Sequence, residues 1–172
     1  MLLFHQLPIY QVYATSSVCV AWFVVPQAAS YRLVFQDKND QVVQSITTTD
    51  TLYFVNLASA DFPEKTAKIT ISVPNLPQLH PTSLTLQPVS TNPTAWAALE
   101  VAMEAFLSDN HLPTPPTQTE DWLALASFFV QKGLVVNALG AYRQALNTAS
   151  EAEQVGVRAV YEVFVKQYAK PY

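Results

Sequence analysis

Cysteine, glycine and charge are all scarce in this chain of 172 residues. The single cysteine, Cys19, excludes an intramolecular disulfide and a cysteine metal cluster. None of the three glycines, at 133, 140 and 156, has the spacing of a glycine-rich phosphate loop. Charged residues make up 13% of the chain, about half of the share in a typical soluble domain. The net charge of −4 gives no attraction for a phosphate backbone, so we expect no nucleic-acid partner.

Long apolar runs are also missing. No stretch approaches the roughly 18 apolar residues of a membrane-crossing helix, so we expect no membrane span. The N-terminus lacks a basic segment followed by an apolar run, so no signal peptide is visible. A surface of uncharged polar residues is common in extracytoplasmic bacterial proteins. It slightly favours a periplasmic or cell-envelope location and leaves a cytoplasmic one open.

Residue groupings typical of catalysis are absent as well. His5, His80 and His111 lie in separate loop-like segments, without a carboxylate or cysteine at ligand spacing. There is no G-x-S-x-G nucleophile motif. Cys19 lies in a strand-like run, where a small buried apolar residue is expected. We therefore expect no catalytic residues, no metal and no cofactor, and a protein that is not an enzyme.

Residues 1–90 carry the alternation of β-strands. Seven short strands are predicted at intervals of about ten residues, in the stretches 9–14, 18–25, 31–36, 41–47, 51–55, 67–73 and 83–89. This count and spacing predict an antiparallel two-sheet β-sandwich. A smaller open sheet docked on the helices is the alternative.

Two aromatic positions of this half match a known pattern. Trp22 lies on the second predicted strand and Tyr31 opens the third, and with them the region resembles a fibronectin type III or immunoglobulin-like domain. The corner Asp61-Phe62-Pro63 has the expected proline but is not followed by the tyrosine of the fibronectin corner. The resemblance implies a sandwich, and this departure puts the exact family in doubt.

From Pro93 the apolar period changes to that of a helix, which divides the chain into a β domain at 1–90 and a helical domain at 91–172. Helices are predicted at about 93–108 and 151–167, with a proline-rich linker at 108–117. The last helix has a broad apolar stripe, which we expect to pack on the preceding helices and on the sheet. Its apolar residues are Val155, Val157, Ala159, Val160, Tyr161, Val163, Phe164 and Tyr168.

The segment 121–150 predicts two short helices that fold back on each other. Apolar residues recur at helical spacing on both sides of Gly133, where a left-handed residue can end the first helix. Small residues such as Ala126 and Ala138 let the two backbones approach, while Trp122 and Phe129 fill the remaining space.

This spacing is similar to that of one tetratricopeptide repeat. Trp122, Leu125 and Phe129 match its first helix, Gly133 its turn, and Ala138, Tyr142 and Ala145 its second helix, while Ser150 replaces the usual proline. The resemblance implies a four-helix antiparallel bundle of tetratricopeptide type. It also marks Asn137 as a peptide-binding candidate, because asparagines hold the peptide backbone in peptide-clamping members. The alternative for Asn137 is a solvated polar residue.

Two functions follow as hypotheses. The first is a non-enzymatic adaptor or scaffold of a multiprotein or cell-envelope assembly, with a protein partner and self-association left open. The second is a ligand- or carbohydrate-binding sandwich that uses exposed aromatics such as Tyr10, Tyr13 or Tyr53. An exposed row of aromatics would favour the second, and an apolar groove between helices would favour the first.

Overall fold

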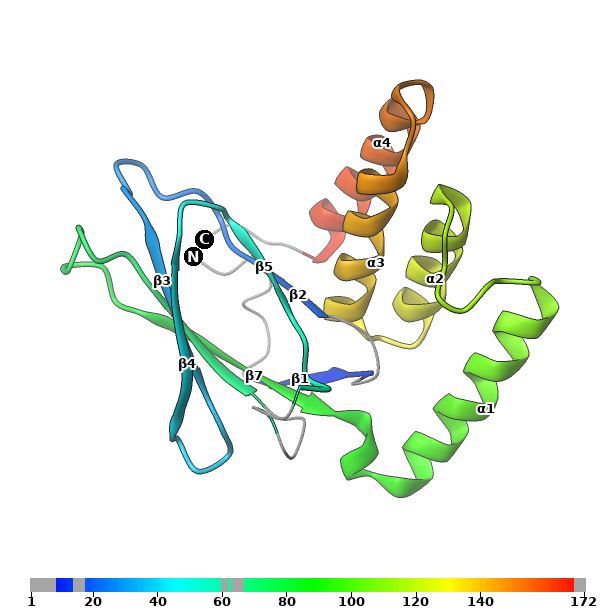
Figure 1. The fold of residues 1–172 in the computed structure, drawn as a ribbon, viewed down its shortest axis with the longest axis horizontal. Coiled ribbons are helices and arrows are strands. Elements are labelled where there is room, and N and C mark those ends of the chain that lie inside the picture. The colour runs from blue at the N-terminus through cyan, green and yellow to red at the C-terminus, as the bar shows by residue number, and fades with distance from the viewer. Residues whose placement is uncertain (1–8, 14–17, 60–61, 63–66, 169–172) are drawn as a thin grey trace.

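The computed structural model describes residues 9–13, 18–59, 62 and 67–168, which form strands followed by helices (Figure 1). The strands are β1 (Ile9–Val12), β2 (Val18–Ala21), β3 (Tyr31–Gln36), β4 (Val42–Thr48), β5 (Leu52–Val55), β6 (Ala67–Ser72) and β7 (Thr82–Pro88). The 3-10 turn η1 (Val89–Thr91) leads to α1 (Pro93–Asp109), α2 (Thr119–Gln131), α3 (Val135–Thr148) and α4 (Glu151–Tyr168). The α+β class is confirmed, and an element is present at each predicted strand and helix, although β2 ends at Ala21 and not at residue 25 as predicted.

The strands form two sheets. Five of them pair in the order β1-β7-β6-β3-β4, and β2 pairs with β5 in a separate two-stranded sheet. The prediction of purely antiparallel strands is wrong at β1, which runs parallel to β7 with Ile9 opposite Thr85. Alternation shows which residues face inward, but it carries no information on strand direction.

Alternating side chains of the two sheets form the core of the β half. On β3, Tyr31, Leu33 and Phe35 are buried, whereas Arg32 is exposed. Phe35 lies 5.6 Å, between ring centroids, from Tyr53 of the two-stranded sheet. The inward side chains of both sheets therefore share one apolar cluster.

Strand β2 joins this core to the helices. All four of its residues are buried, because the five-stranded sheet covers one face and α3 packs on the other. The apolar cluster consequently continues from the strands into α2 and α3.

The expected four-helix bundle is formed only in part. Helices α2, α3 and α4 pack in sequence, whereas α1 slants away from them in Figure 1. Helix α1 contacts the other helices through its side chains. The ring of Phe106 on α1 lies 4.8 Å, between centroids, from the ring of Phe128 on α2. The buried residues of α1 are Leu99 and Met103, so one narrow side of this helix packs against the rest of the protein.

Helix α4 is less covered than its apolar stripe predicts. Val157 and Phe164 are buried, and the Phe164 ring lies 4.8 Å from Tyr142 of α3. Val155, Val160 and Val163 are 78%, 46% and 65% exposed. The stripe is wider than the surface that α3 offers, so the expectation that all of it packs inward is wrong.

Candidate functional site

The site is built on the turn between α2 and α3. Gly133 has a φ of +70°, the left-handed conformation that glycine adopts most easily. Its N–H donates to the carbonyl of Val130, at 3.0 Å, and the N–H of Leu134 donates to that of Phe129, at 2.8 Å. This pair of bonds is the Schellman ending of a helix. It reverses the chain, so α2 and α3 lie antiparallel, as predicted.

Asn137 lies in the first turn of α3 and is 1% exposed, so the alternative of a solvated residue is wrong. Its side-chain oxygen accepts a hydrogen bond from the Tyr13 N–H at 2.9 Å, and its side-chain nitrogen donates to the Tyr13 carbonyl at 3.1 Å. The Asn137 amide therefore holds the backbone of the residue after β1 by both of its polar groups. Its binding to a separate peptide stays a prediction.

The Tyr13 side chain separates α1 from the helical hairpin. Its ring stacks on Trp96 of α1, with the centroids 5.2 Å apart and the planes 19° from parallel. On its other side it lies 6.3 Å from the ring of Phe129. A tyrosine held between the two helices keeps their backbones apart and leaves space between them.

That space is a cavity of about 380 Å³, which we call the helical hollow. Its walls come from Tyr13, α1, the loop before α2, and both helices of the hairpin. They consist of Tyr13, Met103, Leu107, Thr114, Pro115, Pro116, Trp122, Leu125, Phe129, Asn137, Gly140, Ala141 and Gln144. None of these residues is charged, and most of them are apolar.

Polar groups of the hollow lie mainly on α3. Asn137 stands at one end of the helix, and Gln144 follows two turns later on the same face. Within the described part of the chain, no hydrogen bond occupies the Gln144 side-chain amide. The hollow thus combines apolar walls with a free amide that can donate and accept.

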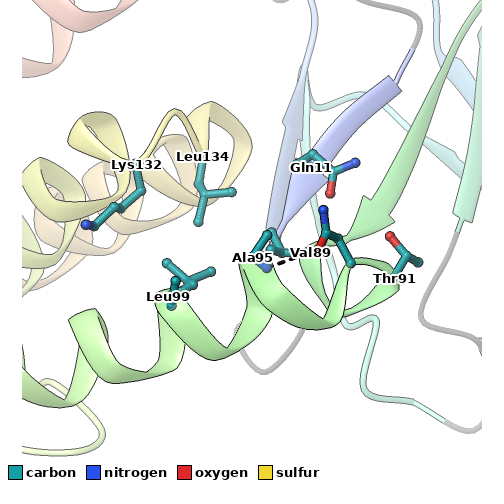
Figure 2. A pocket seen from close by; sticks show the side chains of 9 residues that line it. Gln11, Val89, Thr91, Ala95, Leu99, Lys132 and Leu134 are labelled. Atoms are coloured by element: carbon teal, nitrogen blue, oxygen red, sulfur yellow. Dashed lines mark hydrogen bonds between the residues drawn. The ribbon is translucent and has the colours of Figure 1, made fainter.

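A second cleft, of about 430 Å³, lies between β1, the start of α1 and the α2–α3 turn. Three of its polar side chains already form hydrogen bonds: Gln11 donates to Gln87 at 3.2 Å, Thr91 donates to the Pro88 carbonyl at 2.9 Å, and Asn92 accepts from the Ala95 N–H at 3.1 Å. Figure 2 shows the Lys132 amino group on the far side of this cleft from Gln11. That amino group lies 5.5 Å from the Phe128 ring centroid. The second cleft is therefore less suited to a ligand.

The three tyrosines of the carbohydrate hypothesis do not form an exposed row. Tyr10 is buried, and Tyr13 and Tyr53 are half-buried against other rings. The large hydrophobic side chains that are exposed among the described residues are aliphatic. The structure thus offers no specific support for a ligand site on the sheet.

The titratable residues singled out in the sequence lie apart from the hollow. Burial raises the pKa of the Cys19 thiol to about 12, and the thiol is fully buried, as predicted. His80 and His111 are exposed, while His5 lies outside the described residues. In the described part of the chain, no three His, Cys, Asp or Glu side chains gather as metal ligands would.

Two features of the sequence lie at the hollow, the proline-rich linker and Trp122. The proline-rich linker 108–117 is exposed at Thr114 and Pro115, and together with Pro116 these residues form one wall of the hollow. Trp122 was expected to fill the hairpin, yet it is half-buried and lines the same space. A proline-rich loop beside a tryptophan is the pattern that could have indicated a groove.

Known protein-family models give no match to the chain, and neither do curated proteins. Among the described helices, none is both long enough and apolar enough to cross a bilayer.

Proposed function

We propose that the protein is a non-enzymatic protein-interaction module, an adaptor or scaffold that holds an uncharged apolar segment of a partner protein in the helical hollow. The observation that carries this proposal is the cavity of about 380 Å³ with no charged residue in its lining. Binding sites for small groups have volumes of about 300 to 1,000 Å³ and are mostly apolar, with a few placed polar groups. Burying a charge there without a counter-charge would be costly, so the lining selects an uncharged occupant.

The chemistry of α3 favours a peptide. An extended peptide presents backbone N–H and carbonyl groups that need hydrogen bonds when they are buried. Asn137 already meets this need for Tyr13, and Gln144, also in the lining, has the same amide group free. Trp122 and Phe129 supply flat apolar walls for a proline, aromatic or aliphatic side chain of the partner.

The resemblances fit this proposal. A hairpin of tetratricopeptide type commonly holds peptides, and α2 and α3 have its order of helices with a turn at Gly133. For the β half we infer an immunoglobulin-like or fibronectin type III-like sandwich, supported by the separate β2–β5 and β1-β7-β6-β3-β4 sheets. In this account the β half is a rigid support that positions Tyr13.

The test begins with selection of peptides of random sequence against the full chain. We expect the selected peptides to lack charge and to be rich in proline, aromatic or aliphatic residues. Gln144→Glu then places a carboxylate in the apolar lining and should weaken their binding by about tenfold or more, measured by calorimetry. Trp122→Ala removes one wall and should weaken binding similarly.

The matched control is Gln78→Glu, which makes the same change on an exposed loop of the β half. It should leave binding within about twofold of the wild type. Peptides that bind Gln144→Glu and Trp122→Ala as tightly as the unaltered chain would rule out the hollow as the binding site.

A further inference from the structure

The outer side of α4 is an apolar surface that the chain itself leaves uncovered. Ala152, Val155, Ala159, Val163 and Lys166 recur every three or four residues and are all exposed, so they form one stripe on the helix. The opposite side of α4 packs on α3 through Val157 and Phe164. The valines of the stripe are among the most exposed large apolar side chains of the described residues.

Charges line one edge of this stripe. Arg158 and Glu162 lie one turn apart on that edge, and Glu151 lies near its start. Within the described residues, none of the three forms an ion pair, and neither does Lys166. An apolar centre with unpaired charges of both signs is the composition of an interface core and its rim.

We propose that this outer face of α4 is a homodimer surface, on which α4 of a second copy packs antiparallel. A two-fold axis near Ala159 places Val155 of one copy opposite Val163 of the other. Such an interface is self-complementary, because each contact is made twice. The small side chain of Ala159 at the crossing point lets the two helices approach closely.

Charge complementarity selects the antiparallel orientation. A side chain contacts residues within about half a turn of the position opposite to it. Arg158 therefore comes within reach of Glu162 of the second copy, and Glu151 within reach of Lys166. Each of these contacts is made twice, so four attractive contacts outnumber the one like-charge contact that the two Arg158 side chains make beside the axis. A parallel pair would instead turn the charged edge toward Val160 and Gln167 of the second copy, where no opposite charge lies.

The interface is small. Helix α4 has 18 residues and is about 27 Å long, so we expect weak, concentration-dependent dimerisation rather than a permanent dimer. This surface lies on the opposite side of α4 from the hairpin and is separate from the hollow. The inference therefore stands or falls independently of the proposed peptide binding.

Sedimentation equilibrium of the full chain over a concentration series tests the proposal. We expect a monomer–dimer equilibrium that Ala159→Arg weakens by about 100-fold, because two long cationic side chains would replace the small Ala159 at the crossing point and add to the charge of the two Arg158 side chains beside it. Arg158→Glu should weaken the dimer by about tenfold, and adding Glu162→Arg should restore it, because the exchanged pair is again complementary. Val101→Arg, at an exposed valine of α1, should leave the equilibrium unchanged, as should Gln144→Glu in the hollow.

Cysteine cross-linking tests the orientation. Chains carrying Val155→Cys and chains carrying Val163→Cys should form a disulfide with each other when mixed, while each alone should cross-link poorly. Cys19 is buried and does not compete. A chain that stays monomeric at all concentrations, a dimer that survives Ala159→Arg, or cross-linking of Val155→Cys mainly with itself would overturn the proposal.

Discussion

The β half and the helical half differ in how closely their elements pack on one another. In the β half, the inward side chains of both sheets meet, and Leu33, Phe35, Ile69 and Leu86 are fully buried. In the helical half, Tyr13 keeps α1 away from the hairpin and leaves the hollow. Helix α4 likewise covers α3 with one face and exposes valines on the other.

The difference indicates where binding occurs. A closed core contributes to stability and offers no surface to a partner, whereas an incompletely covered apolar surface is typical of interaction sites. The hollow lies among helices of the helical half, with Tyr13 as its one wall residue from the β half, and the other surface is the outer side of α4. Substitutions in the core of the β half should therefore change stability most, and substitutions at the hollow or on α4 should change binding most.

The largest effect is expected from the core of the β half. Phe35 is fully buried and contacts Tyr53 and Phe62, so Phe35→Ala should lower the free energy of unfolding by about 3 to 5 kcal/mol. Trp122→Ala, at a half-buried wall of the hollow, should cost less than half of that amount. Urea unfolding followed by circular dichroism measures both. Equal losses would remove the contrast between a closed and an open half.

A smaller effect is expected where the halves meet. Asn137→Leu removes both hydrogen bonds to Tyr13, so part-buried backbone groups lose a partner and stability should fall by about 1 to 3 kcal/mol. Asn147→Ala, at an exposed position of the same helix, should change it by less than about 0.5 kcal/mol. Urea unfolding compares the two variants. An Asn137→Leu variant as stable as Asn147→Ala would mean that this contact does not join the halves.

Two glycines of the helical half should respond in opposite directions. Gly133 needs its positive φ, so Gly133→Ala should destabilise the protein by about 1 to 2 kcal/mol through backbone strain alone, since nothing lies within 4 Å of an added Cβ. Gly156 lies within α4 with equally open space, so Gly156→Ala should stabilise by about 0.5 to 1 kcal/mol. Thermal unfolding at low protein concentration, where monomers predominate, distinguishes the two. If both variants changed the melting temperature in the same direction, the left-handed turn at Gly133 would be contradicted.

The smallest effect concerns pH. The hydroxyl and backbone N–H of Ser150 donate to the Glu153 carboxylate, and these bonds lower its pKa below the ordinary value. A lowered pKa stabilises the fold fully above the unfolded value of about 4.3, and this contribution disappears as the pH falls through the lower folded value. Ser150→Ala should therefore reduce the melting temperature slightly at pH 7, and the difference should shrink at about pH 2.5. A difference independent of pH would assign the effect to something other than this carboxylate.

Local features of the fold were predictable from the sequence. Alternation located β3 and β6, helical periodicity located α2 to α4, and Gly133 marked the reversal, because each of these depends on nearby residues. The features that make the site depend on distant residues. The parallel direction of β1 depends on its pairing with β7, and the burial of Asn137 and the position of α1 depend on where Tyr13 lies, far from both helices in the sequence.

The open surface of α4 escaped prediction for a related reason. A stripe of apolar residues shows that a helix can be covered and does not show that the chain supplies the cover. The sequence indicated the same apolar character for Val155, which is exposed, as for Val157, which is buried. The two valines lie on opposite sides of α4, and α3 covers the side of Val157.

Hydrogen exchange of backbone amides, measured on the full chain with and without a selected peptide, tests the central claim most directly. Binding in the hollow predicts increased protection in α1, α2 and α3 around Met103, Phe129 and Gln144, with β3, β4 and β6 unchanged. Protection confined to those strands would show that the β half carries the binding site and would contradict the account.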